Sequence, residues 1–257
     1  MRDGSVWFAQ TRGTVMAEPL LSVRSISKSF RGLQALSEVS FNVEQGHIVA
    51  LIGPNGAGKT TCFNMIAGAF ATDSGEIRFA GQRIDGMRPD QVCLAGIGRT
   101  FQLVKPFAGL SVLDNVIVGA LRRNSRVEVA RRKAGAILER LGLVEKRSQP
   151  ASSLTLPDRK RLEVARALAT EPRLLLLDEV MAGLRPTETD QMVAVFRRLS
   201  VEDGLTILLI EHVMRAVMAL SREIHVMHHG ELIASGSPED VVRNPAVLDC
   251  YLGEEAA

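Results

Sequence analysis

Cysteine is scarce in this sequence, and the three that occur are far apart. Cys62, Cys93 and Cys250 show no C-x-x-C spacing, which argues against a zinc site and a disulfide framework and favours a reducing cytoplasm. No apolar run approaches the roughly 18 residues that cross a bilayer, and the first residues lack a signal-peptide core. We therefore expect any role at a membrane to depend on a partner protein.

Excess charge of either sign is also absent. The net charge of +2 gives no reason to expect a nucleic-acid partner. Hydrophobic residues make up 46% and charged residues 23% of the 257 residues, which excludes a disordered or fibrous chain and allows one substantial core. Residues 1–16 have mixed charge without periodicity, so we expect a disordered extension or a start codon assigned too early. The predicted globular domain is residues 17–257.

The most specific motif is a glycine-rich loop. Gly53-Pro54-Asn55-Gly56-Ala57-Gly58-Lys59-Thr60 fits the G-x-x-x-x-G-K-[ST] phosphate-binding pattern at every fixed position. Residues 47–52 before it are typical of a buried strand, and residues 60–67 after it are typical of a helix. A glycine-rich turn that only joins strand to helix is the alternative, and the complete motif with both flanks disfavours it.

The loop predicts how a phosphate would be held. Its three glycines allow successive N–H groups to turn toward phosphate oxygens, and the following helix points its positive end at the same anion. Lys59 would reach the β- and γ-phosphates, and the Thr60 hydroxyl would ligate Mg²⁺.

Residues around this unit predict a small antiparallel β layer. Residues 20–27 and 35–43 alternate apolar and polar side chains, and residues 76–80 with 83–84 suggest a further hairpin. Phe30 precedes the turn between the first two strands. It would either stack on a base or belong to the core, and its position alone favours the core.

Residues 111–121 and 127–141 have apolar residues at helical spacing and almost no strand signal. We therefore predict an inserted helical subdomain at about residues 104–170. Its basic runs, Arg122-Arg123 and Arg131-Arg132-Lys133, are more typical of a solvated helix face than of a nucleic-acid or headgroup contact.

Two buried strands deliver polar residues to one sheet edge. Residues 174–177 are four leucines followed by Asp178 and Glu179, and residues 206–210 lead into Glu211 and His212. In a phosphate-loop protein the first carboxylate holds Mg²⁺ and the second orients or deprotonates water. The alternatives are a strand end that meets solvent and a structural histidine. A terminal hairpin at 223–234 and two short helices opened by Pro238 and Pro245 complete the prediction.

With these motifs in this order, the chain from Leu20 onward resembles the ATP-binding subunits of ABC transporters. The resemblance rests on the phosphate loop, Gln102, Asp178-Glu179 and His212. It implies an α/β fold, with a P-loop NTPase (RecA-like) core, an antiparallel β subdomain and the inserted α-helical subdomain. It also implies ATP and Mg²⁺ as ligands, and ATP hydrolysis as the activity.

The resemblance also implies roles for single residues. Phe30 would stack on adenine, which reverses the preference from position alone, and Thr61 would add an α-phosphate contact. Gln102 would sense Mg²⁺ and the γ-phosphate, Glu179 would be the catalytic base, and His212 would hold the γ-phosphate and the attacking water. The implied magnesium ligands are Thr60, Gln102 and Asp178.

Finer features look like the branched-chain amino acid importer branch, in its first ATPase type. These are Arg99-Thr100-Phe101-Gln102, Ala182-Gly183-Leu184, and the ending from Asn244-Pro245 to Tyr251-Leu252-Gly253. The branch implies a second ATPase subunit, or a second copy of this chain, together with two membrane permeases and an external solute-binding protein. It implies a cytoplasmic protein held at the inner face of the plasma membrane, importing branched-chain amino acids, with urea- or amide-type solutes as alternatives.

One motif departs from the family. The Leu-Ser-Gly-Gly-Gln signature would fall at Leu154-Thr155-Leu156-Pro157-Asp158, where both glycines are replaced and proline has no N–H to donate. Thr155 and Asp158 predict a capping box whose carboxylate competes with phosphate for the helix end. Because family signatures act on the partner's nucleotide, we expect a weakened partner site in an asymmetric heterodimer. A scaffold that binds ATP with little turnover is the alternative.

Overall fold

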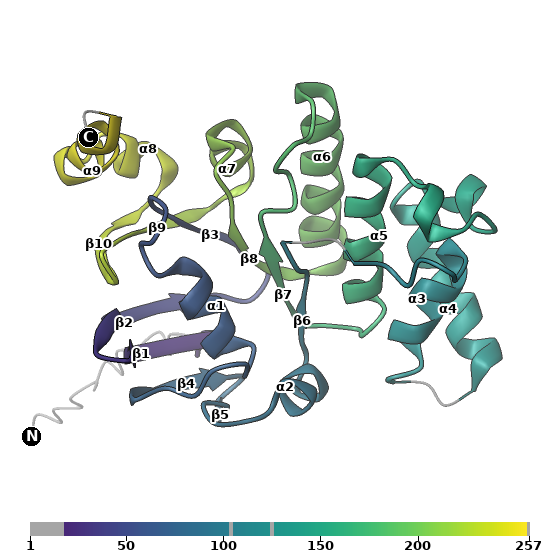
Figure 1. Ribbon diagram of the computed structural model, residues 1–257, viewed down its shortest axis with the longest axis horizontal. Helices are drawn as coiled ribbons and strands as arrows, with labels where there is room; N and C mark the ends of the chain where they lie inside the picture. Colours follow the sequence, from purple (N-terminus) through teal and green to yellow (C-terminus); the bar gives the residue numbers. More distant parts are fainter. Residues whose placement is uncertain (1–17, 103–104, 124–125, 256–257) are drawn as a thin grey trace, which may run out of the picture.

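The protein has an α/β fold with two sheets and a group of helices packed at one side (Figure 1). A computed structural model describes residues 18–102, 105–123 and 126–255. The predicted extension at residues 1–16 lies outside the described residues, as does residue 104, where the helical insert was expected to begin. The division into a core and an insert at 104–170 therefore stays a prediction.

The larger sheet has the order β10-β9-β3-β8-β7-β6, with β10 antiparallel and the other pairs parallel. Every residue of three of its strands is buried: β3 (Ile48–Ile52), β7 (Leu174–Asp178) and β8 (Thr206–Ile210). Strands that are buried along their whole length are covered on both faces of the sheet. The sheet is completed by β6 (Ile97–Arg99), β9 (Glu223–His228) and β10 (Glu231–Gly236).

Alternate residues of these strands pack into two separate hydrophobic cores. Ala50, Leu175 and Leu209 lie in one cluster, whereas Leu51 and Leu176 lie in the other. Successive side chains of a strand point to opposite faces, so the sheet separates the two cores. Its carboxyl edge, where β3, β7 and β8 end, is left free for polar residues.

The smaller sheet has the order β2-β1-β4-β5 and is antiparallel throughout. Its strands are β1 (Leu21–Phe30), β2 (Leu33–Val43), β4 (Ser74–Phe79) and β5 (Gln82–Arg83). The predicted hairpins are confirmed, although Gln82 begins a strand and the turn is Ala80-Gly81. Helix α1 (Lys59–Ile66) shares a core with β1, β2 and β4.

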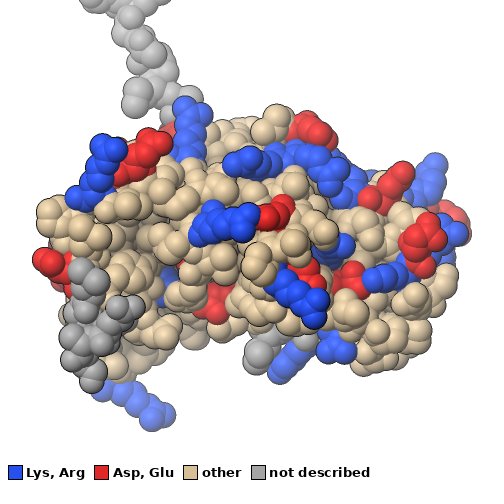
Figure 2. All heavy atoms as spheres, turned by 90° about the horizontal axis from the view of Figure 1, so that it is seen from above, with Lys and Arg blue, Asp and Glu red and all other residues tan. Residues whose placement is uncertain are grey.

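The helical region packs on the other core. It consists of α3 (Val112–Ala120), α4 (Val127–Arg140), the short turns η1 (Val144–Lys146) and η2 (Ala151–Ser153), and α5 (Leu156–Leu168). Ala130, Ala134 and Leu138 recur at helical spacing on α4 and are all buried in this core. The helical pattern read from the sequence is therefore confirmed. Arg131 and Arg132 point to solvent, and on the face drawn in Figure 2 basic side chains are interspersed with acidic ones.

Besides the short turns η1 and η2, the sequence had not predicted α2 (Pro89–Ala95), β6, α6 (Pro186–Asp203) and α7 (Met214–Leu220). The sequence does signal α6, because Pro186 occupies its first turn, Glu188 accepts the Arg185 N–H at 2.8 Å, and Gly204 ends it. The two C-terminal helices are confirmed as α8 (Pro238–Val242) and α9 (Pro245–Glu255). Within the described ranges, none of the helices combines the length and apolarity that crossing a bilayer requires.

Candidate active site

The glycine-rich loop runs from the end of β3 to the start of α1, as predicted. Gly53 and Gly58 have φ values of 142° and 100°, in the region that side chains disfavour. A Cβ atom at Gly53 would lie 2.0 Å from the carbonyl oxygen of Met227, and one at Gly58 would lie 2.6 Å from that of Ala35. Packing against neighbouring backbone therefore fixes both residues as glycine.

A cavity of about 450 Å³ opens over this loop. Residues 55–61 of the loop and the start of α1 line it, and a Cβ at Gly56 would meet nothing within 4 Å, so the middle of the loop faces open space. Lys59 is buried, and its Nζ donates to the carbonyl oxygens of Gly53 and Pro54 at 2.6 and 2.7 Å. The ammonium group thus arches back over the loop, where it would meet a bound phosphate. The predicted residues brought together here are Asn55, Gly56, Ala57, Gly58, Lys59, Thr60, Thr61, Gln102 and Glu179.

The acidic edge faces this cavity. Glu179 follows β7 with φ of 49°, a left-handed conformation that costs a non-glycine residue about 1–3 kcal/mol. Its carboxylate accepts a hydrogen bond from Gln102 Nε2 at 2.7 Å and lies 2.9 Å from His212 Nε2. Three residues that the sequence separates widely are therefore in direct contact, with the carboxylate between the other two.

Asp178 ends β7 one residue earlier and is almost fully buried. Burial raises the pKa of its carboxyl group, while the adjacent Arg99 opposes that shift. Thr60, Gln102 and Asp178 line a common cavity of about 470 Å³. The described residues contain no cluster of three or more His, Cys, Asp or Glu side chains able to hold a metal. One carboxylate and one hydroxyl beside a phosphate cradle fit Mg²⁺, which is usually bound by few protein ligands together with substrate phosphates.

Phe30 is not a core residue, so that alternative is wrong. Its side chain is 39% exposed at the end of β1 and packs edge to face on Phe70, with ring centroids 5.2 Å apart. The phosphate-loop cavity is lined from this hairpin by Leu33, Gln34 and Ala35. Stacking of Phe30 on adenine stays a prediction.

The expected capping box at α5 is wrong in its hydrogen bonds. Thr155 does occupy the N-cap position, but its side chain accepts no backbone N–H. Instead its hydroxyl donates to Asp158 Oδ2 at 2.7 Å, and Lys146 pairs with the same oxygen. Burial alone would raise the pKa of Asp158, yet these partners hold it below the ordinary value. The carboxylate is therefore neutralised locally, which reduces the repulsion expected toward a phosphate.

The other signature positions differ in exposure. Leu154 is buried, whereas Leu156 is 46% exposed in the first turn of α5. Leu156 also lies close to the loop that follows Glu179. A Cβ atom added to Gly183 of that loop would be 3.4 Å from Cδ2 of Leu156. Pro157 has no N–H to present beside it. An apolar side chain thus stands where the family signature has glycine.

Three further residues contact the site, and the sequence had assigned none of them a role there, although it placed Glu211 at the sheet edge and Arg99 in a family feature. Arg99 pairs with Asp178, and Lys160 Nζ donates to the main-chain oxygen of Glu179 at 3.0 Å. Glu211 Oε1 accepts the N–H of Met181 at 2.7 Å. Arg99 and Lys160 are charged residues within otherwise apolar or helical stretches. Because a buried charge needs a partner, their positions were the only signal in the sequence that they contact other polar groups.

Comparison with known proteins decides the family. The sequence profile described as "ABC transporter" matches residues 36–182, more than half of the chain. This chain belongs to the ATP-binding subunits of ABC transporters. A second profile, "Branched-chain amino acid ATP-binding cassette transporter", matches residues 231–257 of this cassette.

Curated relatives of this ABC subunit cover nearly all of it. It is 40% identical over 255 residues to the high-affinity branched-chain amino acid transport ATP-binding protein LivG of Escherichia coli K12, covering 93% of this chain and all of the relative. It is 38% identical over 256 residues to the corresponding protein BraF of Pseudomonas aeruginosa, with 93% of this chain covered.

Solved ABC cassettes have the same fold. A nucleotide-free ATP-binding cassette from an ABC transporter superposes with a TM-score of 0.84 at 30% identity, covering 91% of this chain and 99% of that one. The ADP conformation of an ATP-binding cassette gives the same TM-score and identity, covering 92% and 99%. The predicted P-loop NTPase fold with an antiparallel β subdomain is therefore confirmed, and the protein is an ATP-binding, ATP-hydrolysing transporter subunit.

Proposed function

We propose that this ABC ATPase powers the import of branched-chain amino acids through membrane permeases. The observation that carries the proposal is the placement of Glu179 between Gln102 and His212, opposite the phosphate loop. The C-terminal profile and the names of the relatives support the class of solute. The subunit would sit at the inner face of the plasma membrane, attached to two permeases that receive solute from an external binding protein.

Each residue of the site has a task in hydrolysis. The loop N–H groups and Lys59 bind the β- and γ-phosphates, and the hydroxyl of Thr61 contacts the α-phosphate. Glu179 accepts a proton from the attacking water, and His212 orients that water and the γ-phosphate. Gln102 and His212 both contact this carboxylate and orient it.

We further propose that Mg²⁺ accompanies ATP and is held by Thr60, Gln102 and Asp178. Its chemistry is to neutralise charge that develops on the phosphates during cleavage. The residues themselves contribute a hydroxyl at the start of α1, an amide and a buried carboxylate.

The divergent signature supports an asymmetric pairing with a second ATPase subunit. Pro157 lacks a backbone N–H and Leu156 adds an apolar side chain where the partner's nucleotide would bind, whereas the site built on Lys59 and Glu179 keeps the residues that this chain would contribute and would borrow the partner's signature. The weakening would come mainly from lost donors and the exposed leucine, because Asp158 is neutralised by Lys146.

The experiment is Lys59→Ala, compared with Lys133→Ala on the solvated face of α4. Loss of charged hydrogen bonds to phosphate should weaken ATP binding at least about tenfold and abolish uptake in vesicles carrying the assembled importer, while the Lys133 variant behaves as the parent. Intact affinity and uptake with Lys59→Ala would overturn the proposal. A solute panel with leucine, isoleucine and valine against urea and amides tests the solute class separately.

A further inference from the structure

Arg99 joins the two elements that carry the proposed Mg²⁺ ligands. Its Nη1 donates to Asn64 Oδ1 on α1 at 2.7 Å, and its Nη2 donates to Asp178 Oδ2 at the end of β7 at 3.1 Å. Asn64 lies one helical turn after Thr60, so both face the same side of α1. A single guanidinium group therefore spans the gap between the hydroxyl-bearing helix and the carboxylate-bearing strand.

The contact is shielded from water. The side chains of Arg99 and Asp178 are 13% and 4% exposed, so solvent screens their attraction little. Arg99 ends β6 and is paired in register with Leu176 of β7, two residues before Asp178. Strand pairing thus brings the arginine to the carboxylate, and the planar fork of the guanidinium matches two acceptors at once.

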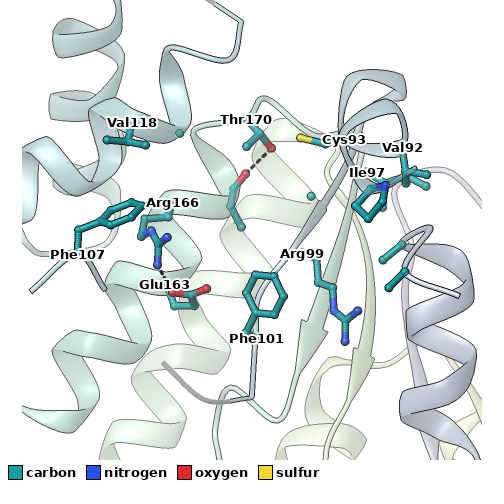
Figure 3. Close-up of a pocket in the computed structure, with 16 residues that line it drawn as sticks. Val92, Cys93, Ile97, Arg99, Phe101, Phe107, Val118, Glu163, Arg166 and Thr170 are labelled. Carbon is teal, nitrogen blue, oxygen red and sulfur yellow. Dashed lines mark hydrogen bonds and ion pairs between the residues drawn. The ribbon is translucent and has the colours of Figure 1, made fainter. Parts of the chain in front are cut away.

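Arg99 also borders an apolar groove of about 380 Å³ between the sheet and the helical region. Figure 3 shows it beside Phe101, with the Glu163–Arg166 pair on the other side of the groove. The guanidinium carbon lies 5.5 Å from the centre of the Phe101 ring. Arg140 offers a comparison away from the metal site: it pairs with Asp203 at 2.6 Å and joins α4 to α6.

We propose that Arg99 is a positioning residue for the metal site, holding Asp178 in the orientation that Mg²⁺ requires. The inference rests on the proposed Mg²⁺ ligands. Carboxylates that ligate metals are commonly fixed by hydrogen bonds from behind, and removing such a partner weakens metal affinity about ten- to hundredfold. Arg99 occupies one oxygen of Asp178 and leaves the other for the metal. Its second bond, to Asn64, keeps the carboxylate at a set distance from Thr60.

The test is the Mg²⁺ dependence of binding of a fluorescent ATP analogue to the purified full chain. Arg99→Met keeps the length of the side chain but loses both hydrogen bonds. It should raise the Mg²⁺ concentration for half-maximal effect about tenfold or more, with affinity measured in EDTA unchanged. Arg140→Met is the control and should leave the Mg²⁺ titration as in the parent.

Arg99→Lys keeps the charge but cannot bond Asn64 and Asp178 together, so it should give a smaller shift in the same direction. If Arg99→Met does not fold, the Mg²⁺ titration of Arg99→Lys tests the proposal in its place. An unchanged or lowered Mg²⁺ requirement in these variants would overturn the proposal. Asp178→Asn tests the proposed magnesium site independently of the proposal for Arg99. If this variant keeps the Mg²⁺ dependence of the parent, the magnesium site itself is assigned wrongly.

Discussion

Lys160, on the first turns of α5, donates a hydrogen bond to the main-chain carbonyl of Glu179 at 3.0 Å. The helix that carries the signature positions is thereby tied to the backbone of Glu179, the carboxylate that we propose as the catalytic base. Glu179 has a left-handed conformation, which persists only where surrounding contacts impose it. Lys160 is one of these contacts, and the N–H of Glu179, which donates to Ile210 at 2.9 Å, is another.

We expect Lys160→Met to reduce turnover without a matching loss of ATP binding. A small displacement of the Glu179 carboxylate from the position where it would activate water should slow hydrolysis about tenfold or more. The substitution does not change the phosphate loop, so ATP binding should be kept. Steady-state ATPase assays and nucleotide titrations of the same preparation measure the two effects. Arg197→Met is the control, because Arg197 also donates to a main-chain oxygen, that of Ala219, away from the site. Equal losses in kcat and affinity would contradict the assignment.

Glu211 predicts a pH dependence of stability. Burial raises the pKa of its carboxyl group from 4.5 to about 7, despite the opposing effects of the Met181 N–H and Lys160. The folded state therefore retains this proton while the unfolded state loses it. Its stabilising effect is complete below pH about 4.5 and is lost as the pH rises to about 7, a change of roughly 3 kcal/mol.

Glu211→Gln removes this titration and keeps the shape of the side chain. The difference in Tm between this variant and the parent should therefore move in favour of the variant as pH rises from 5 to 8. Thermal unfolding at matched ionic strength measures it, and Glu231→Gln at an exposed position should leave its difference constant. If the difference in Tm between Glu211→Gln and the parent also stays constant with pH, the pKa of Glu211 is not raised in the folded protein.

The sequence predicts this fold where the signals are local. The apolar runs of β3, β7 and β8 and the complete phosphate-loop motif locate the sheet edge without any tertiary information, because each depends on neighbouring residues. The contacts of Arg99 are different: its bond to Asp178 spans 79 positions along the chain, and no periodicity reveals it. Thr155 shows that a local pattern can also mislead. The sequence has the capping pattern, but Asp158 pairs with Lys146 from the separate turn η1 and accepts the Thr155 hydroxyl, so the expected cap does not form.

Phe30 is expected to bind the base although it is not among the residues that line the phosphate cavity. Phe30 is 39% exposed, packs edge to face on Phe70 and has the Lys28 ammonium 5.5 Å from its ring centre, so a base would stack on the part of the ring that is exposed. Base–aromatic stacking is worth about 1–3 kcal/mol, so Phe30→Ala should weaken ATP binding about tenfold while Phe30→Tyr retains it. Leu94→Ala, at an exposed apolar position of α2 outside the phosphate-loop cavity, is the control. If inorganic triphosphate binding falls as much as ATP binding, the effect is not base stacking.

The asymmetry between the two ATP sites is tested by Glu179→Gln in the complex assembled with its partner ATPase and permeases. Removing the general base should lower hydrolysis by about 10²–10⁴-fold, because this site is expected to supply nearly all turnover, and ATP-bound dimers should accumulate. The same change at the partner's catalytic glutamate should leave most of the activity. If instead hydrolysis survives Glu179→Gln, the competent site is the partner's.

Restoring glycine at the signature sharpens this test. Leu156→Gly with Pro157→Gly returns a backbone N–H to the first turn of α5 and removes the exposed leucine beside Gly183. In the Glu179→Gln background these changes should raise turnover at the partner's site, since the donors act across the interface. Equal thermal stability of the two complexes would show that the gain does not come from a change in stability, whereas no gain would mean that the leucine and proline do not limit the partner's site.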